Sequence, residues 1–416
     1  MKFYLTLSLY LITTTIVFAD DLATNKKSRI NQNDQATTLT NQTKVTKKAL
    51  EDMLIQAEKN YGKHAEELLP ILEKLVLITQ KNSPKESKVY NIRRTKIYLR
   101  HNSSEFITQF KDINLPTTKH SKDTLKRVNK FFKRDFKLYE SAHWSIIYHP
   151  SQEKRVIRKI VPHMEKTYDS ALSFLISFGF RNKPLKKKMT AIYFQSREDY
   201  INYFSKFTPH DKLIKQSLGV YVQQLNTLGF FDHGEGKKKV SPRTVSHESA
   251  HQIMFNAGLQ LNPRNQPRWL FEGLASTFEP LDRKREFGPH TNNYSPKRMQ
   301  QIIRLQTENS VPTLTDLVSS SYKAEYNKKN SSSVYAMGSM LVNFLYQHYP
   351  DEFKEYLKIL AKSKPTRGGL DRKRMFSHAF GDPDVLQPAF EVFVIKSLSE
   401  FKELRNQAKK KALNSL

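Results

Sequence analysis

Hydrophobic residues recur at three- and four-residue spacing soon after the start of the chain. The segment 49–80 (ALEDMLIQAEKNYGKHAEELLPILEKLVLITQ) follows this pattern, which places apolar side chains on one face of an α-helix. The pattern predicts a helical pair, faintly similar to a tetratricopeptide unit, although no second copy makes it a repeat. We therefore expect an accessory helical region over residues 46–130.

Beyond residue 143 the hydrophobic pattern becomes that of strands. HWSIIYHP (143–150) alternates, and MTAIYF (189–194) is a short apolar run, so both predict β-strands. Ser196 is placed to cap a short helix directly after the second strand. The segment 217–231 predicts one or two further strands.

Helical patterns fill the rest of this part of the chain. Apolar positions between Pro150 and Gly179 recur at helical spacing, and every long periodic segment after residue 231 is also helical. A small mixed sheet followed by helices is an α+β arrangement. We expect one such domain over residues 143–400, followed by a basic C-terminal helix or tail over residues 401–416.

The first 45 residues have no core-forming pattern. Residues 1–19 combine Lys2, an apolar run and a terminal Val-Phe-Ala, which predicts a signal peptide cleaved after Ala19. The alternative is an uncleaved membrane anchor, but the run is short and interrupted by hydroxyl residues. Residues 20–45 are rich in Thr, Asn, Gln and Lys, as is typical of a flexible linker.

Composition narrows the chemistry. The chain has no cysteine, which excludes disulfides and thiolate zinc sites and leaves histidine and oxygen groups as metal ligands. Its 69 Lys+Arg against 40 Asp+Glu give a net charge of +29, which favours an anionic partner such as an envelope surface. No aromatic-interleaved basic motif predicts specific nucleic-acid binding, and no later segment predicts a transmembrane helix. The mature protein is expected to be exported, periplasmic or extracellular.

A candidate metal site lies in VSHESAHQIMFNAGL (245–259). Ser241 and Pro242 predict the start of a helix and Gly258 its end. On this helix His247 and His251 share one face, because they are four residues apart, and Glu248 lies beside them. The alternative is a surface helix with two solvated histidines.

A second motif, QPRWLFEGLASTFEP (266–280), predicts another helix that begins at Pro267 and ends at Pro280. Its core side is expected to contain Trp269, Leu270, Leu274 and Phe278. Glu272 can be aimed at the first helix, and two histidines with one glutamate are an attested zinc ligand set. Glu279 is placed to accept a hydrogen bond from a ligating imidazole.

H-E-x-x-H followed by W-L-x-E-G-x-A resembles the gluzincins, the zinc peptidases that include thermolysin-like and aminopeptidase-N-like enzymes. The wider stretch also resembles an uncharacterised bacterial family of exported proteins, a domain of unknown function with a peptidase-MA-like fold. The resemblance implies a gluzincin or thermolysin-like catalytic domain in which His247, His251 and Glu272 hold Zn²⁺. It implies that Glu248 is the general base acting on an activated water.

The segment upstream of the metal helix departs from one gluzincin pattern. Aminopeptidases of that clan carry G-x-M-E-N there, whereas this chain has LGVYVQQLN (218–226), without a glutamate for a free amino terminus. Aminopeptidase activity is therefore not expected. Gly219, Val220 and Tyr221 are candidates for an edge strand that pairs with an extended peptide; an ordinary core strand is the alternative.

A tyrosine further along is the candidate electrophile for the oxyanion. SSSVYAMGSMLVNFLYQ resembles the Y-x-x-G helix start of aminopeptidase-like enzymes, which implies this role for Tyr335 and close helix packing at Gly338. The alternative is that Tyr335 only packs in the core. The other candidates are His290, Tyr294, Tyr322, Tyr326, His348 and His378.

These features together predict an exported zinc-dependent metallopeptidase that hydrolyses peptide bonds, in endopeptidase fashion, in peptide or protein substrates. The alternative is a non-catalytic module of the same fold that keeps zinc and binds an anionic envelope component through its basic surface. A purely structural zinc has no need of Glu248, so the full motif favours the enzyme.

Overall fold

The fold comes from a computed structural model, which describes residues 46–102, 113–180, 185–207, 211–232, 240–259, 267–320, 328–362 and 369–413. The chain divides into two compact units, residues 1–101 and 102–416. The predicted signal peptide (1–19) and linker (20–45) lie outside the described residues.

The described part of the first unit is helical, as predicted. It contains α3 (Lys47–Tyr61), the short 3₁₀ helix η1 (Glu66–Leu68), α4 (Leu69–Asn82) and α5 (Pro84–His101). Thr46 caps α3, and Gly62 ends it at a φ of +91°, which only glycine adopts readily. Leucines 50, 54, 68, 72 and 75 form the core with Ile97. The helical pair expected from segment 49–80 is therefore completed by α5.

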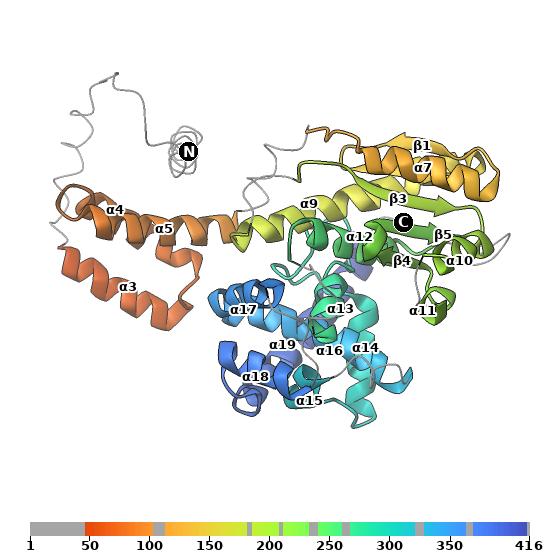
Figure 1. The fold of residues 1–416 in the computed structure, drawn as a ribbon. Helices are drawn as coiled ribbons and strands as arrows, with labels where there is room; N and C mark the ends of the chain where they lie inside the picture. Colours follow the sequence, from red (N-terminus) through yellow and green to blue (C-terminus); the bar gives the residue numbers. More distant parts are fainter. Residues whose placement is uncertain are drawn as a thin grey trace, which may run out of the picture. The chain divides into compact units, whose positions relative to one another are not determined.

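The second unit contains a five-stranded mixed sheet in the order β1-β2-β3-β5-β4 (Figure 1). Its strands are β1 (Lys137–Glu140), β2 (Trp144–Tyr148), β3 (Met189–Phe194), β4 (Gly219–Val222) and β5 (Thr227–Phe231). The two central pairings are parallel and the two outer pairings are antiparallel. The predicted strands at 143–150 and 189–194 are present, and segment 217–231 forms two strands.

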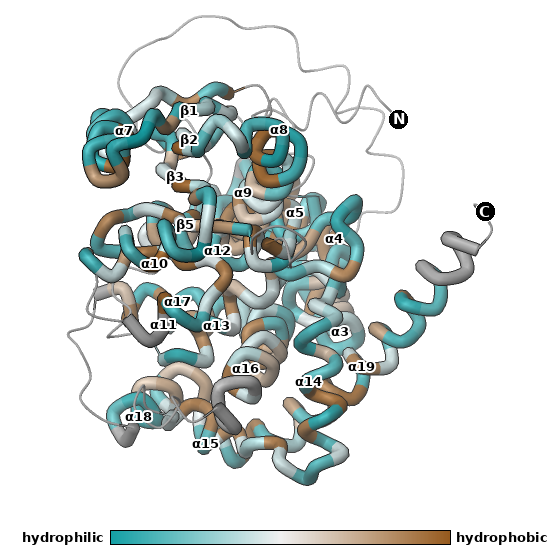
Figure 2. Tube along the Cα trace, turned by 90° about the vertical axis from the view of Figure 1, so that its right-hand side faces the viewer, coloured by the Kyte–Doolittle hydropathy of each residue, from teal (hydrophilic) through white to brown (hydrophobic). Residues whose placement is uncertain are grey.

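An aromatic cluster covers one face of the sheet. The helices α7 (Lys119–Phe132) and α10 (Arg197–Ser205) contribute to one core with the strands β2, β3 and β5. Figure 2 shows the apolar positions of β3 and the hydrophilic outer positions of α7. Because α7 packs on the sheet, it belongs to the second unit. The first unit ends at residue 101, so α7, which lies in the region 46–130 that was predicted as accessory, is part of the second unit.

The other face of the sheet carries two long helical segments. The helix predicted between Pro150 and Gly179 is present, but it starts with the short turns η3 (Pro150–Gln152), α8 (Glu153–Arg155) and the π-helical η4 (Val156–Ile160) before α9 (Val161–Ser177). Beside α9 lies α12 (Pro242–Asn256), which also contacts β4 and β5. In Figure 1, α12 lies between the sheet and α13 (Arg268–Ser276).

The remaining helices complete the α+β arrangement that the sequence predicts. They are α11 (Asp211–Gln216), α14 (Pro296–Thr307), α15 (Leu314–Ser319), α16 (Lys328–His348), α17 (Pro350–Lys362), α18 (Gly369–Phe380) and α19 (Pro383–Leu413). Residues 401–413 continue α19 without a break, so the basic end of the chain is not a separate element there. Among the described residues, none of the helices is long and apolar enough to cross a membrane.

Candidate metal centre

Helix α12 begins and ends as its sequence predicts. The Ser241 hydroxyl accepts a hydrogen bond from the Thr244 N–H, and Pro242 occupies the first turn, where a missing N–H costs nothing. Gly258, at a φ of +84°, closes the helix, and the next N–H reaches back to the Met254 carbonyl. The histidine pair is thus carried on a helix with both ends fixed.

A buried glutamine fixes α12 against the sheet. Gln252 is fully buried, and its Oε1 accepts a hydrogen bond from Trp144 Nε1 at 2.9 Å. Its Nε2 donates to the carbonyls of Thr190 and Asn226 at 3.0 and 2.9 Å. These bonds restrict rotation of the helix about its axis, so Gln252 determines which way His247 and His251 face. Nothing in the sequence around Gln252 singles it out, because its partners come from distant segments.

Helix α13 is shorter than predicted. It begins after Pro267, as expected, but ends at Ser276, one turn before Pro280. The Thr277 hydroxyl bonds back to the Leu274 carbonyl, and a tight turn then carries the chain out of the helix. The predicted core side is confirmed: Trp269, Leu270, Leu274 and Phe278 are all buried. Glu279 therefore lies after the end of α13, and the turn at Thr277 sets the direction of its side chain in place of the helix.

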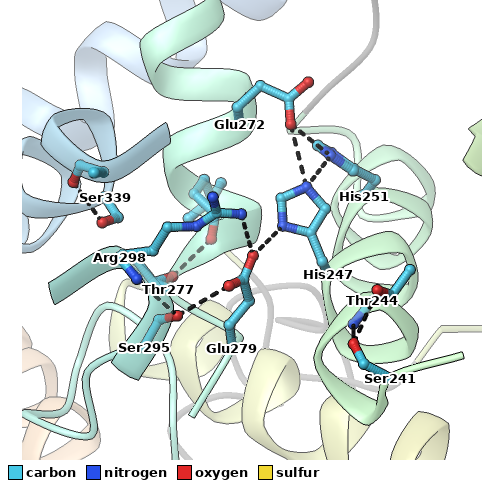
Figure 3. A network of polar contacts seen from close by, with 12 residues as sticks. Ser241, Thr244, His247, His251, Glu272, Thr277, Glu279, Ser295, Arg298 and Ser339 are labelled. Carbon is cyan, nitrogen blue, oxygen red and sulfur yellow. Dashed lines mark hydrogen bonds and ion pairs between the residues drawn. The ribbon is translucent and has the colours of Figure 1, made fainter. Parts of the chain in front are cut away.

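The structure brings His247, His251 and Glu272 together (Figure 3). The Nε2 atoms of the two histidines are 3.2 Å apart, and Glu272 Oε2 lies 3.2 Å from His247 Nε2 and 3.5 Å from His251 Nε2. Ligand atoms about 2.0–2.2 Å from one tetrahedral ion are separated by about 3.3–3.6 Å. The observed separations are close to these values, so the triad could hold a metal ion.

Burial and charge shift the pKa values of the residues in this cluster. Burial opposes protonation of His247, yet hydrogen bonds with Glu272 and Glu279 outweigh it and raise the pKa of His247 to about 9. Burial would likewise raise the pKa of Glu272, but the two histidines hold it well below its usual range. The carboxylates that favour a proton on His247 would also favour a cation at this place.

Glu279 lies behind His247, where the sequence predicts a hydrogen bond to a histidine of the pair. Its Oε1 accepts from His247 Nδ1 at 2.9 Å, so Nε2 is the nitrogen that could bind a metal ion at the triad (Figure 3). Ser295 Oγ donates to the other carboxylate oxygen at 2.9 Å, and Arg298 pairs with Oε1. Burial would raise the pKa of Glu279, but Arg298 and His247 hold it at about 2.

Glu248 lies between α12 and the edge strand β4. Burial raises its pKa, and its Oε2 accepts a hydrogen bond from the Tyr221 N–H at 2.9 Å. That N–H is therefore directed away from β5, on the side of β4 that has no strand partner in the described sheet. Gly219, Val220 and Tyr221 thus lie on the edge strand of the described sheet, and their pairing with a peptide stays a prediction.

Gly219 allows β4 to approach α12 this closely. A Cβ atom there would lie 2.7 Å from the Phe230 ring and 3.1 Å from Thr244 Cγ2, on the first turn of α12. A larger side chain would separate the strand from the helix. The missing side chain thus keeps the Tyr221 N–H in reach of Glu248.

Tyr335 lies beside the triad. Its ring centroid is 5.9 Å from that of His247, and burial raises the pKa of its hydroxyl far above the usual value. The sequence predicted that Tyr335 lies at the start of a helix. Because α16 begins at Lys328, Tyr335 instead lies about two turns inside the helix. Of the other candidates, Tyr294 bonds with Ser397 and His290 pairs with Glu286, while Tyr322 and Tyr326 lie outside the described residues.

Two glycines bring the helix of Glu272 against the helix of Tyr335. A Cβ on Gly273 of α13 would lie 2.4 Å from the backbone carbon of Gly338, and one on Gly338 of α16 would lie 2.5 Å from the Trp269 carbonyl oxygen. Backbone contact at this crossing leaves no room for a methyl group. The close packing predicted at Gly338 is therefore confirmed.

Replacing Gly338 with alanine is expected to destabilise the protein, because the added methyl group forces α13 and α16 apart. Overpacking of this kind costs about 1–3 kcal/mol, measurable as a lower free energy of unfolding in urea. Unchanged stability would show that the helices can separate without cost. The same displacement should also weaken metal binding, since Glu272 adjoins the crossing.

Residues 241–367 match the model of a family described as a protein of unknown function, DUF1570. The matched segment contains the whole triad, Glu248, Glu279 and Tyr335, but none of the sheet. No match was found among curated proteins. The residues gathered at the candidate centre thus lie within one recognised family segment, although the family's description assigns it no activity.

Proposed function

We propose that the protein is an exported zinc-dependent metallopeptidase of the gluzincin type. The observation that carries the proposal is the triad of His247, His251 and Glu272, whose ligand atoms have tetrahedral spacing. With no cysteine in the chain, histidine and carboxylate are the ligands that remain. A zinc ion held there would supply a Lewis acid for the scissile carbonyl and an activated water.

Glu248 fits the role of general base. It directly follows the first histidine, and burial raises the pKa of its carboxyl group above the usual value, which makes it a better proton acceptor. In this role Glu248 would take the proton from the attacking water and deliver it to the leaving amine.

The strand β4 supports a peptide as substrate. Its outer edge lies beside Glu248, so an extended peptide that follows β4 would run past the proposed general base. No acidic side chain of β4 is available for a free amino terminus. Cleavage inside the peptide is therefore the expected mode.

The direct test combines metal content with cleavage of a peptide library. Elemental analysis should give about one zinc per chain, and the library should be cut at internal bonds by the zinc-loaded protein but not after chelation. A protein that holds zinc and cleaves nothing would favour the rival function, a module that binds an anionic envelope component. The net charge of +29 supports that rival.

Replacing Tyr335 with phenylalanine should lower kcat and leave KM and zinc content unchanged. Its hydroxyl is the candidate donor to the oxyanion, and loss of one such donor typically costs about 10²- to 10³-fold in kcat. Steady-state kinetics on a cleaved peptide would measure both constants.

Tyr346→Phe is the matched control for this variant. Tyr346 is a buried tyrosine on the same helix, and its hydroxyl bonds to Ser177 Oγ at 2.9 Å, away from the triad. The kcat of the Tyr346→Phe variant should equal that of the wild type. Equal kcat in the Tyr335 variant would instead assign the ring to packing alone.

A further inference from the structure

Arg298 is a buried cation between two parts of the candidate centre. Its side chain is 8 % exposed and pairs with the Glu279 carboxylate behind His247. Its guanidinium carbon also lies 4.7 Å from the centroid of the Tyr335 ring. One side chain thus contacts both the carboxylate that orients a candidate ligand and the candidate oxyanion donor.

The remaining N–H groups of Arg298 differ in their partners. NH1 donates to Gln301 Oε1 at 3.2 Å, one turn further along α14. The Nε group has no protein partner among the described residues and belongs to a residue that lines a cavity of about 10 Å³. Ser276 Oγ and Asn343 Oδ1, on α13 and α16, also line this cavity and lack partners among the described residues.

This cavity suits one water molecule. Its volume is about that of a single water site, and three of the residues that line it carry a polar atom without a partner among the described residues, which is about the number of bonds that a buried water makes. Asn343 Nδ2 already donates to the Ser339 carbonyl, so its Oδ1 acts as an acceptor. An acceptor beside the arginine N–H favours water over an anion, because water can donate to one group and accept from the other.

We propose that Arg298 is a positioning residue that fixes Glu279 and the Tyr335 ring from one guanidinium group. The inference rests on the proposed metal site. Arg298 touches no ligand atom of the triad, so it acts on the metal through Glu279 and His247. Its planar group can pair with a carboxylate at its edge while its face lies on a ring, and a lysine ammonium cannot do both.

Zinc affinity is the first measurement. Arg298→Met removes the cation but keeps an apolar stem, and it should weaken zinc binding by about 10- to 100-fold, as is typical when the partner of a ligating histidine is disturbed. Arg304→Met is the matched control, since this arginine of the same helix is exposed and pairs only with Glu308 among the described residues. Equal zinc affinity in the wild type and Arg298→Met would overturn the proposal.

A double-mutant cycle tests whether Arg298 affects zinc binding through Glu279. If Arg298 acts through Glu279, zinc binding by the Arg298→Met, Glu279→Gln double variant should be no weaker than that of Glu279→Gln alone. Additive losses would show an independent action and would overturn the positioning role. Arg298→Lys should restore part of the zinc affinity, because the charge beside Glu279 remains. Thermal unfolding of each apo variant identifies losses caused by misfolding.

These measurements separate this inference from the proposed function. If the wild type binds zinc but cleaves no peptide, the peptidase proposal fails while the binding cycle still tests Arg298. If the wild type binds no zinc, both fail. The visible spectrum of the cobalt-loaded protein adds a readout of ligand geometry, which should change in Arg298→Met and remain unchanged in Arg304→Met.

Discussion

Replacing Glu248 with glutamine is expected to abolish peptide hydrolysis while the zinc stays bound and the fold stays intact. Glutamine is nearly isosteric, and its Oε1 can still accept the hydrogen bond from the Tyr221 N–H. Its amide cannot take a proton from water. General acid–base assistance contributes about 10²- to 10⁴-fold, and a residue that serves in both directions of proton transfer should be near the upper end.

The rate of cleavage of one identified peptide, measured with zinc-loaded wild type and variant, checks this prediction. Glu308→Gln is a suitable control, because Glu308 is an exposed carboxylate at the end of α14. A variant that cleaves at the wild-type rate would remove Glu248 from the role of base. If neither protein cleaves any peptide and both hold zinc, the binding module is the better account.

The parts of the site that could be predicted from the sequence are those encoded locally. His247 and His251 share a face because an α-helix has 3.6 residues per turn, and the serine, proline and glycine that bound this helix are visible in the sequence. The strands β2 and β3 could likewise be predicted from short apolar runs. Local patterns also indicated Glu272, since its apolar helix makes an isolated carboxylate costly without a partner.

The parts that could not be predicted depend on contacts between distant segments. Arg298 meets Glu279 across 19 positions, and Gln252 meets Trp144 across 108. An arginine in the first turn of a helix ordinarily looks like a solvated surface residue, and nothing in its neighbours indicates a buried carboxylate. The position of Pro280 predicted the end of α13 one turn too late for a related reason. The turn at Thr277 depends on packing and on backbone hydrogen bonds, which the position of a proline does not indicate.

Removing the third ligand should have the second large effect. Glu272→Ala takes away the only carboxylate of the triad and leaves two histidine nitrogens 3.2 Å apart. We expect zinc affinity to fall by more than the about 10- to 100-fold that is typical of residues behind the ligands. Elemental analysis of the purified variant should find little zinc.

Glu286→Ala is the matched control for this variant. Glu286 is also a partly buried carboxylate, and it is bonded to a histidine, His290, at 3.1 Å, but it is not part of the triad. Zinc content should therefore be unchanged in this control. A Glu272 variant that retains full zinc would exclude Glu272 as a ligand.

Stability gives an independent measure of the same loss. At a free zinc concentration 100 times the wild-type Kd, binding should stabilise the folded wild type by about 2.7 kcal/mol. If Glu272→Ala raises the Kd about 100-fold, the same zinc concentration stabilises the variant by only about 0.4 kcal/mol, because the site is then half filled. Urea unfolding with and without zinc should therefore show a large gain for the wild type and Glu286→Ala and almost none for Glu272→Ala. An equal gain in all three proteins would mean that the stabilising ion binds somewhere other than this triad.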